Sequence, residues 1–159
     1  MSKAYITGQY TEKSQNKDKN HIYGKITDIS FKNFLETIES VVKEFGYSTY
    51  LVHRDLHKWG EIYIEPEEVM KKVMEVIEDC DIVVSCPEYG KGPNVEIGMG
   101  VALGKKIIII MSDHEKTSLV HAGLNGITPT KIVKFKDIMD MKNKLRTALS
   151  EFPDKKLPF

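Results

Sequence analysis

Residues 79 to 112 (DCDIVVSCPEYGKGPNVEIGMGVALGKKIIIIMS) constrain the fold more than any other part of the chain. Two short runs, residues 82–84 and 107–110, are continuously apolar rather than alternating. That pattern is typical of strands in a parallel sheet that is covered on both faces. A loop rich in glycine and proline follows the first run, and a helix of small residues is expected over residues 94–103, ended by Gly104. Strand, loop, helix and strand together predict a right-handed βαβ unit.

The loop and the start of this helix follow a strand, so they belong to the carboxyl edge of the sheet, where open α/β sheets bind ligands. Glu96 falls in the first turn of the expected helix. The partial positive charge of a helix N-terminus favours an ionised carboxyl group there. Glu96 is therefore either an N-terminal helix charge or a nucleophile that faces a pocket.

The rest of the chain alternates in the same way. Further strands are expected at residues 4–7, 47–52 and 132–135, and helices start at Asp28 or Ser30, at Pro66 and at Asp137. Residues 9–25 and 53–65 are expected to be irregular, and residues 117–124 a short helix or turn. The pattern predicts a flavodoxin-like, Rossmann-like doubly wound sheet of five parallel strands in the order 2-1-3-4-5. The helix that starts at Pro66 is expected to bury Val69, Met70, Val73, Met74, Ile77 and Cys80. The helix that starts at Asp137 is expected to bury Ile138, Met141, Leu145 and Leu149.

Composition narrows the possible partners. A chain of 159 residues predicts one domain, over residues 1–152, with a tail at 153–159. Its 23 basic and 23 acidic residues cancel, which argues against nucleic acid polymers and anionic membranes as partners. Two cysteines are too few for a disulfide framework or a zinc site, and Cys80 is expected in the core. Without a signal-like or membrane-length apolar segment, the expected location is cytoplasmic.

Several segments resemble the signature of the nucleoside 2-deoxyribosyltransferase family. They are DIVV at 81–84, GPNVEIG at 92–98 and ALGK at 102–105, and YITG at 5–8 resembles the family's first strand. The resemblance implies cleavage or transfer of the N-glycosidic bond of 2′-deoxynucleosides or their 5′-monophosphates. It makes Glu96 the nucleophile of a covalent glycosyl-enzyme and Tyr5 the hydroxyl that orients it. No cofactor and no metal are expected.

The resemblance also implies a substrate site and an oligomer. Ser118 lies five residues before Gly123, where the transferases carry an asparagine that reaches into the neighbouring subunit's site. The related 2′-deoxynucleoside 5′-phosphate N-hydrolases place a serine there, on the substrate phosphate. A nucleotide is therefore favoured over a nucleoside, and a homodimer or larger assembly is expected. The substrate-binding residues expected are Gly8, Gln9, Asp55, Glu88, Gly90, Gly92, Asn94 and Ser118.

The chain departs from the family pattern at the aspartate that acts as the general acid. The family has an aspartate eight residues before Asp81 that helps to protonate the departing base, and Val73 stands at that position here. Gln9 replaces a serine of the hydrolases, and Gly90 replaces a polar residue, with Glu88 close by. Lys13, Lys91 and Arg54 are candidates to approach a phosphate.

Three alternatives stay open at this point. The chain could be a non-catalytic nucleotide-binding protein that kept the fold but lost the acid. A phosphoribohydrolase of the lysine-decarboxylase-like type also uses a glycine-rich loop and a glutamate, although its Pro-Gly-Gly motif is absent here. His53 and His57 with Asp55 could ligate a metal, but a third neutral ligand is not evident.

Overall fold

The computed structural model describes residues 1–10, 13–16, 24–88 and 90–152; the expected tail at 153–159 lies outside this part. The main sheet consists of β1 (Lys3–Gly8), β4 (Ser48–Leu51), β5 (Ile82–Cys86), β6 (Lys106–Ser112) and β7 (Thr130–Phe135). The long helices are α1 (Ile29–Glu44), α3 (Pro66–Asp79), α4 (Lys91–Ala102) and α6 (Ile138–Ser150). The shorter elements are β2 (Ser14–Asn16), β3 (Gly24–Ile26), α2 (Val52–Asp55), α5 (Leu119–Gly123) and the 3₁₀ turns η1 (Lys58–Gly60) and η2 (Leu124–Gly126).

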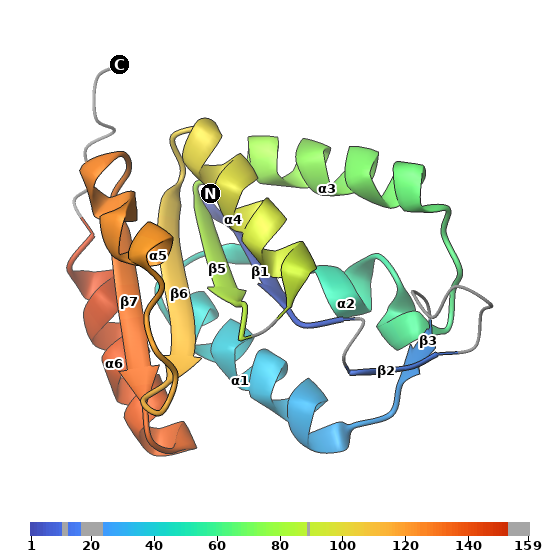
Figure 1. Ribbon diagram of the computed structural model, residues 1–159, viewed down its shortest axis with the longest axis horizontal. Helices are drawn as coiled ribbons and strands as arrows, with labels where there is room; N and C mark the ends of the chain where they lie inside the picture. The colour runs from blue at the N-terminus through green and yellow to red at the C-terminus, as the bar shows by residue number, and fades with distance from the viewer. Residues whose placement is uncertain (11–12, 17–23, 89, 153–159) are drawn as a thin grey trace.

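The main sheet has the predicted topology. Its strands run in the order β4-β1-β5-β6-β7, and every neighbouring pair is parallel. Counted along the chain within this sheet, that order is 2-1-3-4-5, so the doubly wound prediction is confirmed. Helices α1 and α6 cover one face and α3 and α4 the other (Figure 1). None of the helices in the described ranges is both long enough and apolar enough to cross a membrane.

Alternation along β1 divides the core in two. Ala4 and Ile6 belong to the cluster under α1 and α6, whereas Tyr5 belongs to the cluster under α3 and α4. Successive side chains of a strand point to opposite faces, so Thr7 shares the face of Tyr5. The side chains that lead toward the predicted site therefore come from the α3 and α4 side of the sheet.

Local signals fix the helix starts. The Asp28 side chain accepts a hydrogen bond from the Phe31 N–H and caps α1, while Ser30 lies inside the helix. Gly46 follows α1 with φ of +80°, the left-handed conformation that glycine adopts without strain. Pro66 occupies the first turn of α3, where its missing N–H leaves no helical bond unmade.

The prediction of which residues of α3 and α6 are buried is partly wrong. In α3, Val73 and Ile77 are buried and Cys80 lies buried just beyond the helix, but Met70 and Met74 are 40% and 41% exposed. In α6, Met141, Leu145 and Leu149 are buried as predicted, whereas Ile138 is 46% exposed.

The two connections predicted as irregular contain regular structure. Within residues 9–25, β2 pairs with β3 in an antiparallel hairpin that reaches residue 26. Within residues 53–65 lie most of α2 and all of η1. The predicted helix at residues 94–103 starts earlier, at Lys91, with Gly90 as its N-cap. Glu96 consequently lies in the second turn, not the first, and the expected helix-terminus charge does not act on it directly.

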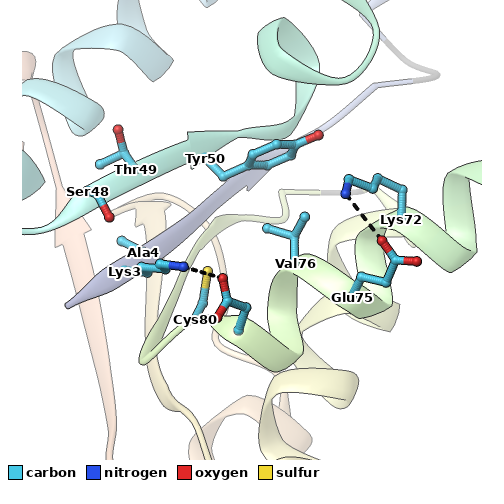
Figure 2. A pocket seen from close by; sticks show the side chains of 10 residues that line it. Lys3, Ala4, Ser48, Thr49, Tyr50, Lys72, Glu75, Val76 and Cys80 are labelled. Carbon is cyan, nitrogen blue, oxygen red and sulfur yellow. Dashed lines mark hydrogen bonds and ion pairs between the residues drawn. The ribbon is translucent and has the colours of Figure 1, made fainter. Parts of the chain in front are cut away.

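A pocket of about 310 Å³ lies at the amino edge of the sheet, between β1, β4 and α3 (Figure 2). Its charged groups pair with one another, Lys3 with Asp79 and Lys72 with Glu75. Cys80 is buried there as predicted, and burial raises the pKa of its thiol to about 11. Tyr50 lines the pocket and stacks on Tyr5 at 6.3 Å between ring centroids, which links this edge to the opposite one.

Candidate active site

Tyr5 and Glu96 are in direct contact. The Tyr5 hydroxyl donates a hydrogen bond of 3.0 Å to Glu96 Oε1 across 91 positions of sequence. Tyr5 is fully buried on β1, and Glu96 projects from α4 onto the same face of the sheet. Glu96 Oε2 is shielded from solvent and has no hydrogen-bond partner among the described residues. One carboxylate oxygen is thus held by a neutral donor, and the other keeps its lone pairs free.

Burial dominates the electrostatics of this pair. It raises the pKa of Glu96 to about 7, while the Thr7 and Tyr5 hydroxyls act in the opposite direction. Burial and the adjacent Glu96 carboxylate raise the pKa of Tyr5 well above its usual value, so Tyr5 stays protonated and remains a donor. A carboxyl group with a pKa near 7 is a functional-site signal, because such groups are ionised or protonated by small changes in their surroundings.

Glu96 opens onto a cavity of about 500 Å³ at the carboxyl edge of the sheet. The floor is formed by Thr7 and Gly8 of β1, and Lys91, Gly92 and Pro93 come from the first turn of α4. The remaining wall is mostly apolar or aromatic: Tyr10, Val52, His53, His57, Tyr63, Ile64, Pro66, Val69, Met70 and Val73. The volume is in the range of small-molecule sites, which are largely apolar with a few placed polar groups.

Two histidines of this wall are buried and neutral. Burial lowers the pKa of His53 to about 4, and burial also lowers the pKa of His57. His53 Nε2 lies 3.0 Å from the Gln9 carbonyl oxygen; because a carbonyl only accepts, Nε2 carries the proton and Nδ1 is a bare acceptor. Nδ1 of each histidine lacks a partner in the described part of the chain. The Tyr10 ring lies against both, with centroids 5.7 Å from His53 and 5.1 Å from His57.

Val73 lines the same cavity and is 1% exposed. The sequence assigned it to the position where the resembled family carries its aspartate. An apolar side chain therefore occupies the position on α3 at which the resemblance implies an aspartate.

Three of the predicted substrate-binding residues line a different cavity. Glu88, Asn94 and Ser118 surround a hollow of about 780 Å³ between α4, α5 and the end of β6. Asn94 Oδ1 lies 2.8 Å from His121 Nε2, and the Ser118 hydroxyl accepts the His121 N–H as the N-cap of α5. These residues lie on the other side of α4 from the aromatic wall, and Glu96 does not line this hollow.

The predicted glycines and Gln9 have distinct positions. Gly8 and Gly92 line the Glu96 cavity. Gly90 does not, and a Cβ there would meet the Pro87 carbonyl oxygen at 3.0 Å and Gln9 Cγ at 3.1 Å, so this glycine permits close packing of the loop. Gln9 is 4% exposed and supports His53 through its backbone carbonyl.

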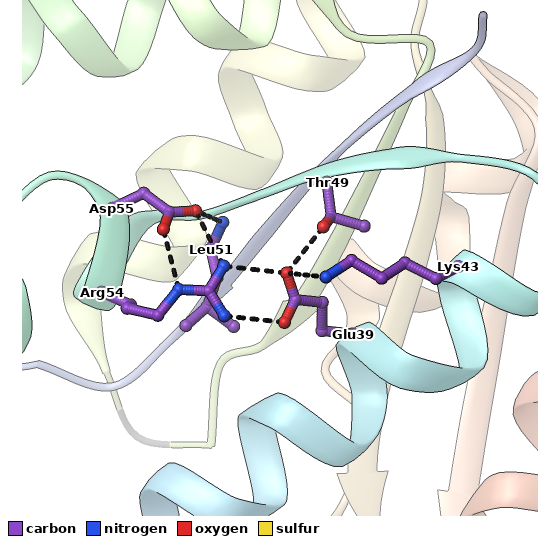
Figure 3. Close-up of polar contacts among 6 residues, drawn as sticks. All are labelled: Glu39, Lys43, Thr49, Leu51, Arg54 and Asp55. Carbon is purple, nitrogen blue, oxygen red and sulfur yellow. Dashed lines mark hydrogen bonds and ion pairs between the residues drawn. The ribbon is translucent and has the colours of Figure 1, made fainter.

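Asp55 belongs to a structural ion network (Figure 3). Its carboxylate accepts the Leu51 N–H at 2.8 Å and the Arg54 Nε–H at 2.8 Å. Arg54 also forms two hydrogen bonds with Glu39, which lowers the pKa of that carboxyl to about 2. Neither Asp55, expected to bind substrate, nor Arg54, a candidate to approach a phosphate, lines the Glu96 cavity.

The metal alternative has no geometric support in the described ranges. No group of three or more histidine, cysteine, aspartate or glutamate side chains there could hold an ion. Asp55 is occupied by Leu51 and Arg54, and His53 by the Gln9 carbonyl.

The aromatic and imidazole wall was not predicted from the sequence. Tyr10 and Tyr63 lie in segments read as irregular, and the two histidines were considered only as metal ligands. Their available signal was position: His53 and His57 directly follow the second strand of the main sheet, at its carboxyl edge, and are four residues apart. A spacing of four places two side chains on one side of a helical turn.

Solved structures share this fold. No protein-family model matches the chain, and no curated protein matches it in sequence. A CMP N-glycosidase of Clostridium botulinum, BcmB, aligns with a TM-score of 0.62 and 18% identity over 90% of this chain and 98% of that one. The solution structure of BlsM aligns with a TM-score of 0.66 and 23% identity over 92% and 88% of the two chains. A 2-deoxyribosyltransferase of Bacillus psychrosaccharolyticus aligns with a TM-score of 0.54 and 18% identity over 89% and 91%. The fold implied by the resemblance in the sequence is therefore confirmed.

Proposed function

We propose that this protein cleaves or transfers the N-glycosidic bond of a nucleoside or nucleotide through a covalent intermediate on Glu96. The observation that carries the proposal is the Tyr5–Glu96 pair, a buried carboxyl group held by a neutral donor at 3.0 Å and open to a cavity of about 500 Å³. A CMP N-glycosidase and a 2-deoxyribosyltransferase have the same fold, which supports the same class of reaction.

The proposed mechanism is that of a retaining glycosidase. Glu96 Oε2 attacks the anomeric carbon while Tyr5 holds Oε1 in place. The bond between that carbon and the base breaks, and its electron pair leaves with the base nitrogen. Water, or a second base, then attacks the same carbon and releases the Glu96 carboxylate.

A 5′-monophosphate is the favoured form of the substrate. Lys91 supplies a positive charge in the lining, and Gly92 leaves the backbone open to close approach in the first turn of α4. The first N–H groups of a helix lack partners and bind anions. Both features would hold a phosphate about one helical turn from Glu96.

The decisive experiment is a mass-spectrometric search for the glycosyl-enzyme. The protein is mixed with 2′-deoxynucleotides and ribonucleotides, quenched in acid and digested. The proposal requires a pentosyl or pentosyl phosphate adduct on the peptide that contains Glu96, and no adduct in the Glu96→Gln variant. Binding of the same nucleotides without adduct or base release would favour instead a non-catalytic nucleotide-binding protein, a possibility that Val73 keeps open.

A further inference from the structure

Three ring donors that line the Glu96 cavity are already occupied. The Tyr10 hydroxyl donates to the Gly24 carbonyl oxygen at 2.8 Å, and the Tyr63 hydroxyl donates to Glu65 Oε2 at 3.1 Å. His53 donates its proton to the Gln9 carbonyl oxygen. Glu96, the nucleophile, is the one carboxyl group among the described lining residues. Among the described lining residues, these three ring donors are therefore not free to protonate a departing base.

Burial lowers the pKa of His57, so this imidazole is neutral, and Lys91 is the one cationic side chain among the described lining residues. It lies in the first turn of α4, five residues from Glu96, which corresponds to about 7.5 Å along the helix axis. The apolar and aromatic wall that includes Val73, His57 and Tyr63 comes from other elements, α2 to α3. Lys91 is thus placed for an anionic group of the substrate, and that wall receives the base.

The wall suits a flat ring that carries positive charge. Tyr10, Tyr63 and the two imidazoles line the cavity, and aromatic faces attract cations. Because both imidazoles are neutral, they do not repel such a ring. The Glu96 carboxylate lines the same cavity and supplies an opposite charge.

Resting on the proposed function, we infer that the preferred substrates are N-glycosides of cationic heteroaromatic bases, such as pyridinium or N-alkylpurinium nucleotides. In such a substrate the ring nitrogen bound to the sugar bears the positive charge. When Glu96 forms its bond to the anomeric carbon, the C–N electron pair passes to that nitrogen and the base leaves neutral. No proton is needed in this step. Water then hydrolyses the glycosyl ester, the hydroxide portion stays on the sugar, and the proton passes to solvent.

The test compares two bases on one sugar phosphate. Nicotinamide mononucleotide carries a pyridinium, and cytidine 5′-monophosphate carries a neutral base; the 2′-deoxy pair is measured alongside. We expect kcat/KM for the pyridinium to exceed that for cytosine by at least about 10²-fold, the lower end of what general acid catalysis contributes. This comparison uses the wild-type protein and does not depend on the folding of a variant.

Two variants separate the missing acid from the ordinary reactivity of pyridinium glycosides. Val73→Asp places a carboxyl group on the cavity wall and should raise the ratio of cytidine to pyridinium kcat/KM by about 10-fold or more. Val73→Asn has similar size and polarity without an acidic proton and should not raise this ratio. If both Val73 variants fail to fold, equal or faster wild-type cleavage of cytidine 5′-monophosphate would still overturn the inference.

The outcomes distinguish this inference from the proposed function. Equal or faster cleavage of cytidine monophosphate, with a Glu96 adduct, would overturn the preference for cationic bases and leave the Glu96 chemistry intact. An equal rise in kcat/KM for both substrates in the Val73→Asp variant would likewise contradict it. No cleavage of any of the four nucleotides and no adduct would overturn the proposed function itself.

Discussion

The Tyr5 hydroxyl and Glu96 Oε1 lie 3.0 Å apart and join strand β1 to helix α4 at the carboxyl edge of the sheet. The bond stabilises the ionised form of a carboxyl group whose burial favours the protonated form. The ring of Tyr5 is itself held in place by stacking on the ring of Tyr50, with an interplanar angle of 11°. The orientation of the donor thus comes from the sheet, independently of substrate.

Removing this donor should move the pH dependence of base release. Tyr5→Phe keeps the ring but loses the hydrogen bond that lowers the pKa of Glu96, so that pKa should rise further above 7. Activity requires the carboxylate, so the rising limb of the pH–rate profile should shift to higher pH by about one unit. Tyr50→Phe is the matched control and should leave the profile in place. An unshifted profile in Tyr5→Phe would show that Tyr5 does not tune the nucleophile.

The titration of Glu96 should also make the free energy of unfolding depend on pH. Its ordinary pKa is 4.5 and its folded-state pKa is about 7, so between these values the folded protein holds a proton that the unfolded chain has lost. The favourable contribution is complete below pH 4.5 and disappears as the pH rises to about 7. The loss is at most about 3 kcal/mol.

The measurement is urea denaturation of the wild type and Glu96→Gln at pH 4.5 and pH 8. Glutamine keeps the shape without the titration, so the variant should gain stability relative to the wild type at pH 8 compared with pH 4.5. The same variant should release no base. A stability difference that does not change with pH would mean that the carboxyl is not buried in solution as it is in the structure.

The sequence singled out Glu96, the proposed nucleophile, but misplaced it on its helix. Gly92 and Pro93 read as loop because both residue types are common in turns, yet Pro93 lies within the first turn of α4, where a missing N–H is tolerated. The helix therefore starts at Lys91, and Glu96 lies one turn deeper. Burial, which a local pattern does not report, then reverses the expected sign of its pKa shift.

The residues of the cavity wall could not be predicted from hydrophobic periodicity, for a different reason. Helix α2 has four residues, too few to show a helical period, so His53 and His57 carried no pattern. Met70 was assigned to the core because it continues the stripe of α3. That face of the helix looks onto the cavity instead of a packed neighbour, which leaves Met70 40% exposed. An apolar stripe in the sequence predicts which face of a helix is apolar. It does not predict whether another element packs against that face.

The Glu39–Arg54 pair should hold α2, and with it His53, against the sheet. Glu39 has a side-chain exposure of 6% and its pKa is lowered to about 2, first by the Arg54 hydrogen bonds. Its contribution is present above its ordinary value of 4.5 and is lost as the pH falls toward 2. Arg54→Met should therefore cost about 1–3 kcal/mol at pH 7 and less near pH 2.5.

Lys43→Met is the control for that experiment. Lys43 also pairs with Glu39, at 3.0 Å, but its side chain is 53% exposed. Exposed pairs contribute little, so this variant should cost less than about 1 kcal/mol. Equal losses in both variants would show that the network does not depend on the arginine. Chemical denaturation at the two pH values provides the comparison.

The second hollow, beside α4 and α5, leads to the prediction of an assembly. Val95 is 52% exposed on α4, and Leu119 and Val120 are 91% and 70% exposed on α5; exposed apolar side chains of this size are common at interaction surfaces. Gly100 cannot contribute to a helix contact, because a Cβ there would meet Ile107 and Val83 at 2.9 Å, so its role is packing on the sheet. We expect a homodimer or larger oligomer that covers this surface.

Leu119→Glu should dissociate that oligomer, as measured by light scattering at assay concentration. If the neighbouring subunit completes the site through Ser118, base release should fall together with the assembly, because Ser118 lies in the hollow next to the Glu96 cavity and not in it. Met139→Glu is the control, since Met139 is 62% exposed on α6, across the sheet from α4. A wild-type monomer that releases base at full rate would contradict the shared site, and an active Leu119→Glu monomer would confine the reaction to one chain.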